Sequence, residues 1–177
     1  ALFAIKLSHI PLSSLLFLQF FFGFLGAICF KFFVLKRREF FNFSALHVLM
    51  LSGILLFNQK CYLSAFRYAQ AAQVDLINYT WPVITALLSI FILRQKASLN
   101  YLLSLIFSLV GVYFAFAPLM NETGFNLEES WGYLLSFFAA FTWALYSVFL
   151  KKYKTQVGSN GLLFSYLPVI CFAFIEA

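Results

Sequence analysis

Long apolar runs separated by short polar stretches follow one another along the whole chain. A helix crosses the core of a bilayer with about 20 predominantly apolar residues, and five of the runs have about that length. The predicted spans are residues 15–35, 45–66, 74–93, 101–119 and 131–150. Residues 1–7 are predicted to end an earlier span, and a further span begins near Gly161. The pattern therefore predicts an all-α, polytopic bundle of transmembrane helices.

The composition favours lipid over water as the surrounding medium. Of the 177 residues, 63% are hydrophobic and 10% are charged, whereas a soluble domain carries roughly 25% charged residues. The lipid bilayer is therefore the expected partner of the surface. The net charge of +6 does not indicate a nucleic-acid partner, because the basic residues fall into short clusters between apolar runs.

The basic residues alternate between the two sides of the predicted bundle. Every second loop is basic, and these loops hold eight basic residues against two in the remaining loops. The eight are Lys36, Arg37, Arg38, Arg94, Lys96, Lys151, Lys152 and Lys154, and the two are Lys6 and Arg67. Lysine and arginine are retained on the cytoplasmic side, so the basic loops are expected inside and residues 120–130 outside.

Two features indicate a fragment of a longer, internally repeated protein. The chain lacks an initiator Met, and both of its ends fall inside apolar stretches. Residues 1–7 recur in weaker form at 144–150, and Ser14-Leu-Leu-Phe17 recurs as Gly161-Leu-Leu-Phe164. The predicted topology orients the two copies in opposite directions across the membrane. Many secondary transporters build two halves around a central site from such inverted repeats.

Polar residues inside a span are functional candidates, because they cost free energy unless they face the bundle or water. One face of the span 74–93 carries Asp75, Asn78, Pro82, Thr85 and Ser89, with Trp81 at its edge. Pro82 has no amide proton, so the carbonyl of Asn78 loses its helical partner. The interruption either lines a cavity or is a packing kink with Asn78 bonded to a neighbouring helix.

A second group of candidates lies in the span 45–66. Asn58, Cys61, Tyr62 and Ala65 share one face of that span, and Lys60 lies on the opposite face. Lys60 can pair with Asp75 as a gate or a proton-linked pair, or its long stem can extend to the outer headgroups. Both interpretations stay open.

The span 131–150 contributes aromatic candidates. Thr142, Trp143, Tyr146 and Ser147 share a broad face, and Trp143 lies too deep for an interfacial belt. Trp143 is therefore predicted to line a pocket or to pack in the core. The sequence contains no phosphate-binding loop, catalytic triad or metal-ligand spacing, so no enzyme activity, metal site or cofactor is expected.

The run from Ala71 to Ser89 resembles the fourth helix of EamA-type transporters in the drug/metabolite transporter superfamily. Its core, Leu76-Ile-Asn-Tyr-Thr-Trp-Pro82, is particularly similar to the aromatic amino acid exporters of that family. Ser108-Leu-Val-Gly-Val-Tyr113 looks like the end of their fifth helix. Trp131-Gly-Tyr-Leu-Leu, followed by Trp143-Ala-Leu-Tyr-Ser147, resembles the opening of their second repeat.

The resemblance implies ten helices in two inverted repeats of five, around a central cavity that exports amino acids or related metabolites. On that plan, residues 1–119 are the first repeat, from the end of helix one to helix five. Residues 120–130 are an external loop, and residues 131–177 are helix six and part of helix seven. Family members often carry a glutamate just after helix four, whereas this chain has Arg94-Gln95-Lys96, which weakens any transfer of a generic family mechanism.

These observations predict a secondary exporter that works by alternating access in a bacterial inner (plasma) membrane. The predicted substrates are small metabolites, in the first place amino acids, with aromatic amino acids among them. The candidates for the substrate path are Asn58, Tyr62, Asn78, Tyr79, Trp81, Trp143 and Tyr146. The candidates for gating or coupling are Lys60, Asp75 and Pro82. The alternatives are an exporter of another metabolite or of a drug-like cation, an intramembrane enzyme, and a membrane subunit that does not transport. The sequence makes no prediction of the oligomeric state.

The predicted orientation is tested with Glu39→Cys and Glu128→Cys, each made in a variant whose native cysteines are replaced by serine. Residue 128 lies in a predicted external loop and residue 39 in a predicted cytoplasmic loop. An impermeant thiol reagent added to intact cells is therefore expected to label position 128 and to leave position 39 unlabelled until the cells are permeabilised. Labelling of position 39 alone on intact cells would refute the orientation and the inverted repeat with it.

Overall fold

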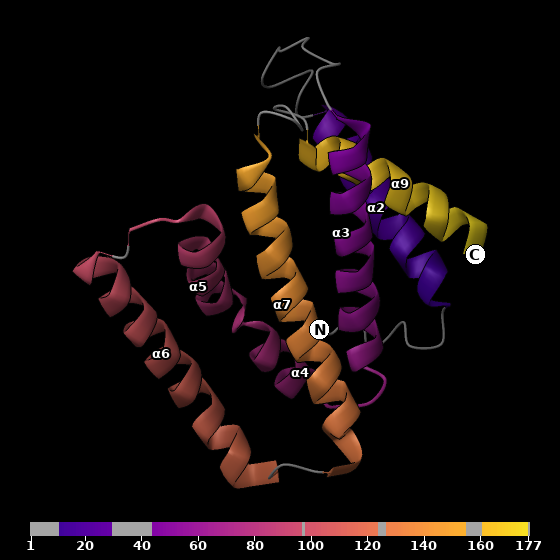
Figure 1. The fold of residues 1–177 in the computed structure, drawn as a ribbon. Helices are drawn as coiled ribbons and strands as arrows, with labels where there is room; N and C mark the ends of the chain where they lie inside the picture. The colour runs from indigo at the N-terminus through magenta and orange to yellow at the C-terminus, as the bar shows by residue number, and fades with distance from the viewer. Residues whose placement is uncertain (1–10, 30–43, 97, 124–126, 155–160, 177) are drawn as a thin grey trace. The chain divides into compact units, whose positions relative to one another are not determined.

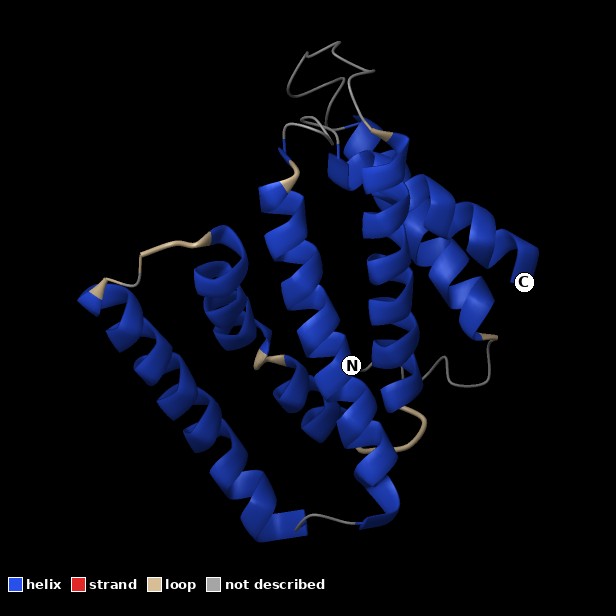
Figure 2. Cartoon of the chain, viewed as in Figure 1, coloured by secondary structure: helices blue, strands red, loops and turns tan. Residues whose placement is uncertain are grey.

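The computed structural model of the chain describes residues 11–29, 44–96, 98–123, 127–154 and 161–176. These residues form helices and contain no β-strand (Figures 1 and 2). Four stretches, with residues 71–93 taken as one, are long and apolar enough to cross a membrane. The all-helical membrane bundle that the hydrophobic pattern predicts is therefore confirmed.

The helix bounds agree with most of the predicted spans. The helices are α2 (Leu12–Cys29), α3 (Ala45–Ala65), α4 (Ala71–Asn78), α5 (Trp81–Leu93), α6 (Leu99–Thr123), α7 (Ser130–Lys152) and α9 (Gly161–Glu176), and the 3-10 turn η2 (Leu127–Glu129) precedes α7. α3 and α7 nearly coincide with the spans predicted at 45–66 and 131–150, and α6 is longer than predicted at both ends. The predicted tail at residues 1–7, and the part of the span 15–35 after Cys29, lie outside the described residues.

The predicted span 74–93 consists of two helices rather than one. α4 ends at Asn78 and α5 begins at Trp81, so Tyr79 and Thr80 form a turn between them. Pro82 lies in the first turn of α5, where its missing amide proton costs no helical hydrogen bond. The interruption expected from this proline is present in the structure.

The turn divides the polar face that the helical period predicts. Asp75 belongs to α4, whereas Thr85 and Ser89 belong to α5. Ser89 is buried and Thr85 is half-buried, but Pro82 is exposed. The polar face that the helical period predicts is therefore divided between two helices.

The described residues fall into two compact units. One unit contains residues 57–148, and the other contains residues 11–56 together with 149–176. The boundary passes through α3 and α7, so each of these helices contributes to both units. All ten residues predicted for the substrate path and for gating lie in the first unit.

In the unit of residues 57–148, α3 runs antiparallel to α7. The side-chain amide of Asn58 donates to the carbonyl of Ala139 over 2.6 Å. Further along α3, Ala65 lies against Gly132, near the start of α7. A Cβ atom added at Gly132 would come within 2.4 Å of the Cβ of Ala69 and 3.1 Å of the carbonyl oxygen of Ala65. The missing side chain of Gly132 is therefore what allows this close approach.

α4 and α5 run parallel to α7 in the same unit, despite the turn between them. The hydroxyl of Ser136 donates to the carbonyl of Val74 in α4 over 2.5 Å. Beyond the turn, the ring centroid of Trp81 in α5 lies 6.5 Å from that of Trp143. Both pairs are 62 residues apart in sequence (136 minus 74 and 143 minus 81). The turn therefore interrupts the helix without changing its register on α7.

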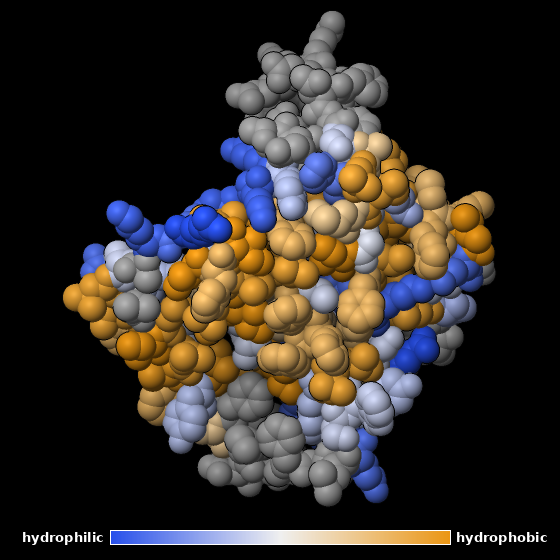
Figure 3. Space-filling model, viewed as in Figure 1, coloured by the Kyte–Doolittle hydropathy of each residue, from blue (hydrophilic) through white to orange (hydrophobic). Residues whose placement is uncertain are grey.

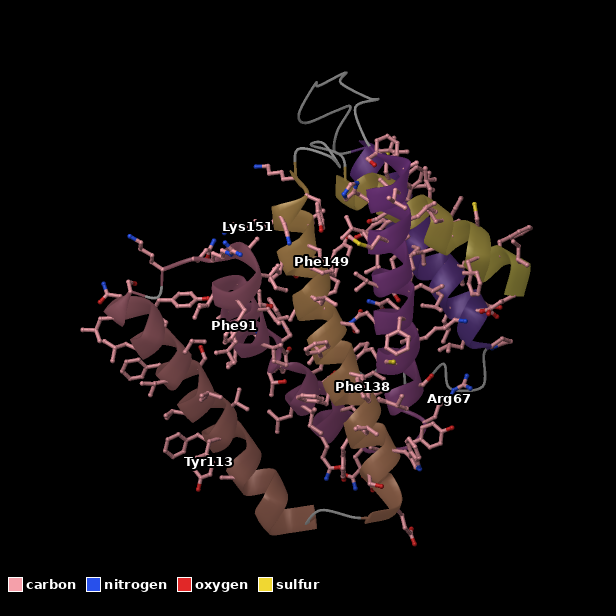
Figure 4. All side chains as sticks on the ribbon, in the orientation of Figure 1. Arg67, Phe91, Tyr113, Phe138, Phe149 and Lys151 are labelled. Atoms are coloured by element: carbon pink, nitrogen blue, oxygen red, sulfur yellow. The ribbon has the colours of Figure 1, made fainter. Side chains whose placement is uncertain are left out.

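α6 packs against α4 and α5 and leaves most of its own surface exposed. Near its start, the hydroxyl of Tyr101 donates to the carbonyl of Ala86 in α5 over 2.7 Å. Phe107 and Tyr113 are 72% and 67% exposed, and Tyr113 points away from the helices of its unit (Figure 4). An exposed aromatic surface of this kind suits contact with lipid or with another apolar helix.

In the other unit, α2 and α9 pack along each other (Figure 1). Phe17 contacts Phe174, and Phe20 contacts Tyr166, so the residue numbers run in opposite directions and the pair is antiparallel. A copy of the short repeat lies near the start of each helix, at residues 14–17 in α2 and 161–164 in α9. Opposite directions are what an inverted repeat requires; the repeat itself stays a prediction.

Hydrophobic side chains cover most of the face drawn in Figure 3. Hydrophilic side chains gather where α5 ends, at Arg94, Gln95 and Lys96, all of which are exposed. On α5 itself, Phe91 is 77% exposed (Figure 4). A large apolar surface with charges at the ends of its helices is the surface that a bilayer solvates.

Gly132→Ala tests the close approach of α3 and α7. The added methyl group would meet backbone atoms that cannot move aside, so the variant is expected to be less stable by about 1–3 kcal/mol, the usual cost of overpacking. Thermal unfolding of the purified protein in detergent measures this change. Gly111→Ala is the control, because no atom lies within 4 Å of its added Cβ. A Gly132→Ala variant as stable as the unchanged protein would contradict the packing.

Candidate functional site

Three of the predicted path residues form one group of aromatic rings between α5 and α7. The rings of Trp81 and Trp143 meet edge to face, with centroids 6.5 Å apart at an interplanar angle of 84°. Trp143 also stacks on Tyr146 at 5.7 Å and 27°. Edge-to-face and offset-stacked contacts are the favourable arrangements of aromatic pairs. We call Trp81, Trp143 and Tyr146 the ring cluster.

The ring cluster consists of one buried ring and two partly accessible rings. Tyr146 is 2% exposed, so its position is set by the surrounding helices. Trp81 and Trp143 are both half-buried. Trp81 follows directly on the turn at Tyr79 and Thr80, so the first residue of α5 carries one wall of the ring cluster.

A hydroxyl–carboxylate pair joins α3 to α4. The hydroxyl of Tyr62 donates to Oδ1 of Asp75 over 2.5 Å, and both side chains are half-buried. The ring of Tyr62 also packs edge to face on Phe66, with centroids 5.0 Å apart. The sequence left open whether Lys60 pairs with Asp75 or extends to the outer headgroups, and that choice stays a prediction. The structure gives Asp75 a hydrogen bond from Tyr62, which lies on the other face of the same helix. Lys60 itself is half-buried.

Asn58 is 4% exposed and its side chain is bonded within the protein. Its amide nitrogen donates to the carbonyl of Ala139 over 2.6 Å and lies 3.5 Å from Oγ1 of Thr142. Its oxygen accepts a hydrogen bond from the side chain of Gln59 over 3.2 Å. In this conformation, Asn58 therefore holds α3 against α7. Its contact with Ala139 lies one helical turn before Trp143, the first residue of the ring cluster on α7.

The remaining path candidates surround the end of α4. Asn78 is half-buried, whereas Tyr79 is 64% exposed. Thr80 in the turn donates its hydroxyl to the carbonyl of Ile77 over 2.7 Å, which satisfies one of the carbonyls that the end of a helix leaves without a helical partner. The structure thus brings Trp81, Trp143 and Tyr146 together, pairs Tyr62 with Asp75, and leaves Tyr79 on the surface of its unit.

The sequence analysis missed a polar group at the start of α7. The hydroxyl of Tyr133 lies 2.7 Å from Oε1 of Gln73 and 3.0 Å from Oε2 of Glu129. The backbone amide of Gln70 also donates to Oε2 of Glu129, over 3.3 Å. These residues lie at the ends of predicted spans, where polar side chains are ordinary. Gln73 differs from an ordinary polar side chain at the end of a span only in being 7% exposed. That burial cannot be read from the sequence.

The chemistry of the site is that of recognition by rings and hydrogen bonds. Among the residues that the structure describes, no three His, Cys, Asp or Glu side chains lie close enough to share a metal ion. The groups available are two partly accessible indoles, one carboxylate oriented by a tyrosine, and a turn in the helix between them. This set can contact a ring and a polar group of the same small molecule.

Comparison with known proteins identifies curated relatives of this chain. The chain is 32% identical to the aromatic amino acid exporter YddG of Escherichia coli (strain K12) over 127 residues, which cover 64% of this chain and 42% of that protein. The YddG protein of Salmonella typhimurium (strain 14028s) matches with the same identity and coverage. The YddG protein of Ancylobacter novellus is 27% identical over 92 residues, which cover 52% of this chain and 32% of the relative. The chain thus spans less than half the length of the curated relatives that it matches.

No solved structure matches the chain. The family comparison is more extensive, since residues 1–117 match the EamA-like transporter family. This region contains α2 to α5, most of α6 and the turn that begins the ring cluster. Together with the helices of membrane-spanning length, the match identifies a multi-pass membrane protein, and the resemblance seen in the sequence is confirmed. The chain belongs to the EamA-like transporter family.

Proposed function

We propose that this chain forms part of a secondary transporter that exports amino acids, foremost aromatic ones, by alternating access across a bacterial plasma membrane. Its membership of a transporter family supports export rather than enzyme activity. The matched relatives are named as aromatic amino acid exporters, which supports the choice of substrate. The observation that carries the proposal is the ring cluster between α5 and α7.

The ring cluster suits a solute that itself carries an aromatic ring. Tyr146 stacks on Trp143 and is almost fully buried, so the indole of Trp143 is held in place. The half-buried indoles of Trp81 and Trp143 leave part of their surfaces for a third ring. One aromatic pair contributes about 0.5–1.5 kcal/mol beyond the area that it buries. Two such contacts favour an aromatic over an aliphatic side chain by about fivefold or more.

The turn between α4 and α5 supports a mechanism in which the helix bends. Transporters often form their sites from discontinuous helices near the middle of the membrane, and helix ends absorb the backbone change of a hinge. Pro82 in the first turn of α5 is the proposed hinge residue. Lys60 and Asp75, which precede the turn in the chain, are the proposed gate.

The proposed substrate path consists of seven residues in the unit of residues 57–148. They are Asn58, Tyr62, Asn78, Tyr79, Trp81, Trp143 and Tyr146. The aromatic members stack on the solute, and the asparagines bind its polar groups. Since Asn58 already bonds the carbonyl of Ala139, a direct role for it requires that the solute replaces this partner during transport.

A drug-like cation is the second candidate substrate. The carboxylate of Asp75 and the indole of Trp81 would both attract a positive charge. Competition experiments distinguish the two substrates. A drug-like cation lacks the carboxylate of an amino acid. It would compete as well as an amino acid only if the site does not need the carboxylate of the substrate. A membrane subunit without transport activity would accumulate neither solute.

Trp81→Ala tests the ring cluster. Removing this indole takes away one wall of the site, so export of labelled phenylalanine is expected to fall to the level of vesicles without the transporter. Accumulation in inverted membrane vesicles containing the intact transporter measures export, and the amount of transporter in the membrane shows that insertion is unchanged. Trp131→Ala is the matched control, because Trp131 is 65% exposed at the start of α7. Unchanged export by Trp81→Ala would remove Trp81 from the site.

Pro82→Ala tests the hinge. Alanine restores an amide proton that can bond the carbonyl of Asn78, and it favours a continuous helix by about 3 kcal/mol relative to proline. The rate of phenylalanine accumulation is therefore expected to fall, while the concentration of unlabelled phenylalanine that halves the signal stays nearly the same. An unchanged rate would show that bending at this turn is not part of transport.

A further inference from the structure

We propose that α4 stays attached to α7 during the transport cycle, while α5 rotates about the turn at Tyr79 and Thr80 and so opens and closes the ring cluster. This inference rests on the proposed function and deepens it, because it assigns a fixed part and a moving part to the two sides of the proposed hinge. Trp81 is the first residue of α5, and Trp143 lies on α7. Movement of α5 relative to α7 therefore separates the two indoles.

Hydrogen bonds between buried groups attach α4 to the first half of α7. The hydroxyl of Ser136 donates to the carbonyl of Val74 over 2.5 Å, and both residues are fully buried. One residue earlier on α4, Oε1 of Gln73 lies 2.7 Å from the hydroxyl of Tyr133, and these side chains are buried as well. Separation of α4 from α7 would leave buried polar groups without these partners, which costs free energy. Movement is therefore not expected on this side of the turn.

Close packing holds the start of α4 in the same place. Gln70 directly precedes α4, and its backbone amide donates to Oε2 of Glu129 over 3.3 Å. A Cβ atom added at Gly132 would come within 2.4 Å of the Cβ of Ala69 and 2.8 Å of its backbone nitrogen. Backbones that pack this closely resist sliding past one another. The start of α4 is thus held by packing as well as by hydrogen bonds.

α5 meets α7 through rings at its first residue. Trp81 lies edge to face on Trp143, with centroids 6.5 Å apart. Two rings can separate and meet again more easily than a buried hydrogen-bonded pair, because they leave no polar group without a partner. Further along α5, the carbonyl of Ala86 accepts a hydrogen bond from the hydroxyl of Tyr101 in α6 over 2.7 Å. The start of α6 is therefore expected to follow α5.

The turn can bend without unwinding either helix. The hydroxyl of Thr80 donates to the carbonyl of Ile77 at the end of α4 over 2.7 Å. The carbonyl of Thr80 accepts the backbone amide of Val83 in α5 over 3.1 Å. Both helix ends are thus closed by the same residue, and a hinge absorbs backbone rotation at a few residues between helices.

Reversible links on the two sides of the turn test which helix moves. Gln70→Cys with Glu129→Cys joins the residue before α4 to the turn before α7, where the two side chains' positions are close. Thr85→Cys with Ser147→Cys joins α5 to α7, because these half-buried residues have the same separation in sequence as the two indoles of the ring cluster. Each pair is made in the intact transporter without other cysteines and is linked with a short bifunctional methanethiosulfonate.

Export of labelled phenylalanine in inverted vesicles is expected to continue when positions 70 and 129 are linked. It is expected to fall to the level of vesicles without the transporter when positions 85 and 147 are linked, and to return after reduction with dithiothreitol. A monofunctional methanethiosulfonate on the same cysteines is the matched control, since it adds bulk without joining the helices and is expected to leave export unchanged. Export stopped by the first link and restored by its reduction, or export that continues with the second link, would overturn the inference while the proposed function stands.

Hydrogen–deuterium exchange of the unchanged transporter in detergent covers the case in which a cysteine pair does not fold or does not react. Addition of phenylalanine is expected to change the exchange of backbone amides in α5 and to leave that of α4 the same, because exchange reports local opening. Equal changes in the two helices would overturn the inference. A transporter that accumulates no phenylalanine in vesicles would contradict the proposed function instead.

Discussion

The unit of residues 57–148 depends on buried side chains that form hydrogen bonds with backbone carbonyls of neighbouring helices. Asn58 bonds the carbonyl of Ala139, and Ser136 bonds the carbonyl of Val74, so α7 is tied to α3 on one side and to α4 on the other. In a membrane, helices gain little from hydrophobic association, and close packing and hydrogen bonds decide how they pair. Gly132 allows the approach that these bonds need.

The same contacts explain how an interrupted helix keeps a defined geometry. A break at Tyr79 and Thr80 could have left α5 free to rotate. However, Trp81 and Trp143 have the same separation in sequence as Val74 and Ser136, so α4 and α5 keep one register along α7. The turn therefore adds a bend without a loss of order. Many secondary transporters form their sites from discontinuous helices, and this turn is the proposed hinge of the transport cycle.

The candidate site separates two kinds of recognition along one helix. The ring cluster follows the turn and offers aromatic surface, whereas the pair of Tyr62 and Asp75 precedes the turn and offers a directed negative charge. The ring cluster is the feature on which the proposed export of aromatic amino acids rests.

The sequence by itself determined the membrane environment, the limits of α3 and α7 and the break before Pro82, because these follow from local properties: the length of an apolar run and a missing amide proton. It also singled out Trp81, Trp143 and Tyr146 as candidates. Only the tertiary structure decided that these rings meet, that Asp75 bonds Tyr62, and that Gln73 is buried beside Tyr133. The helices are apolar on nearly every side, so the hydrophobic pattern does not encode how each one is rotated. That rotation is set by packing and by hydrogen bonds between residues far apart in the chain.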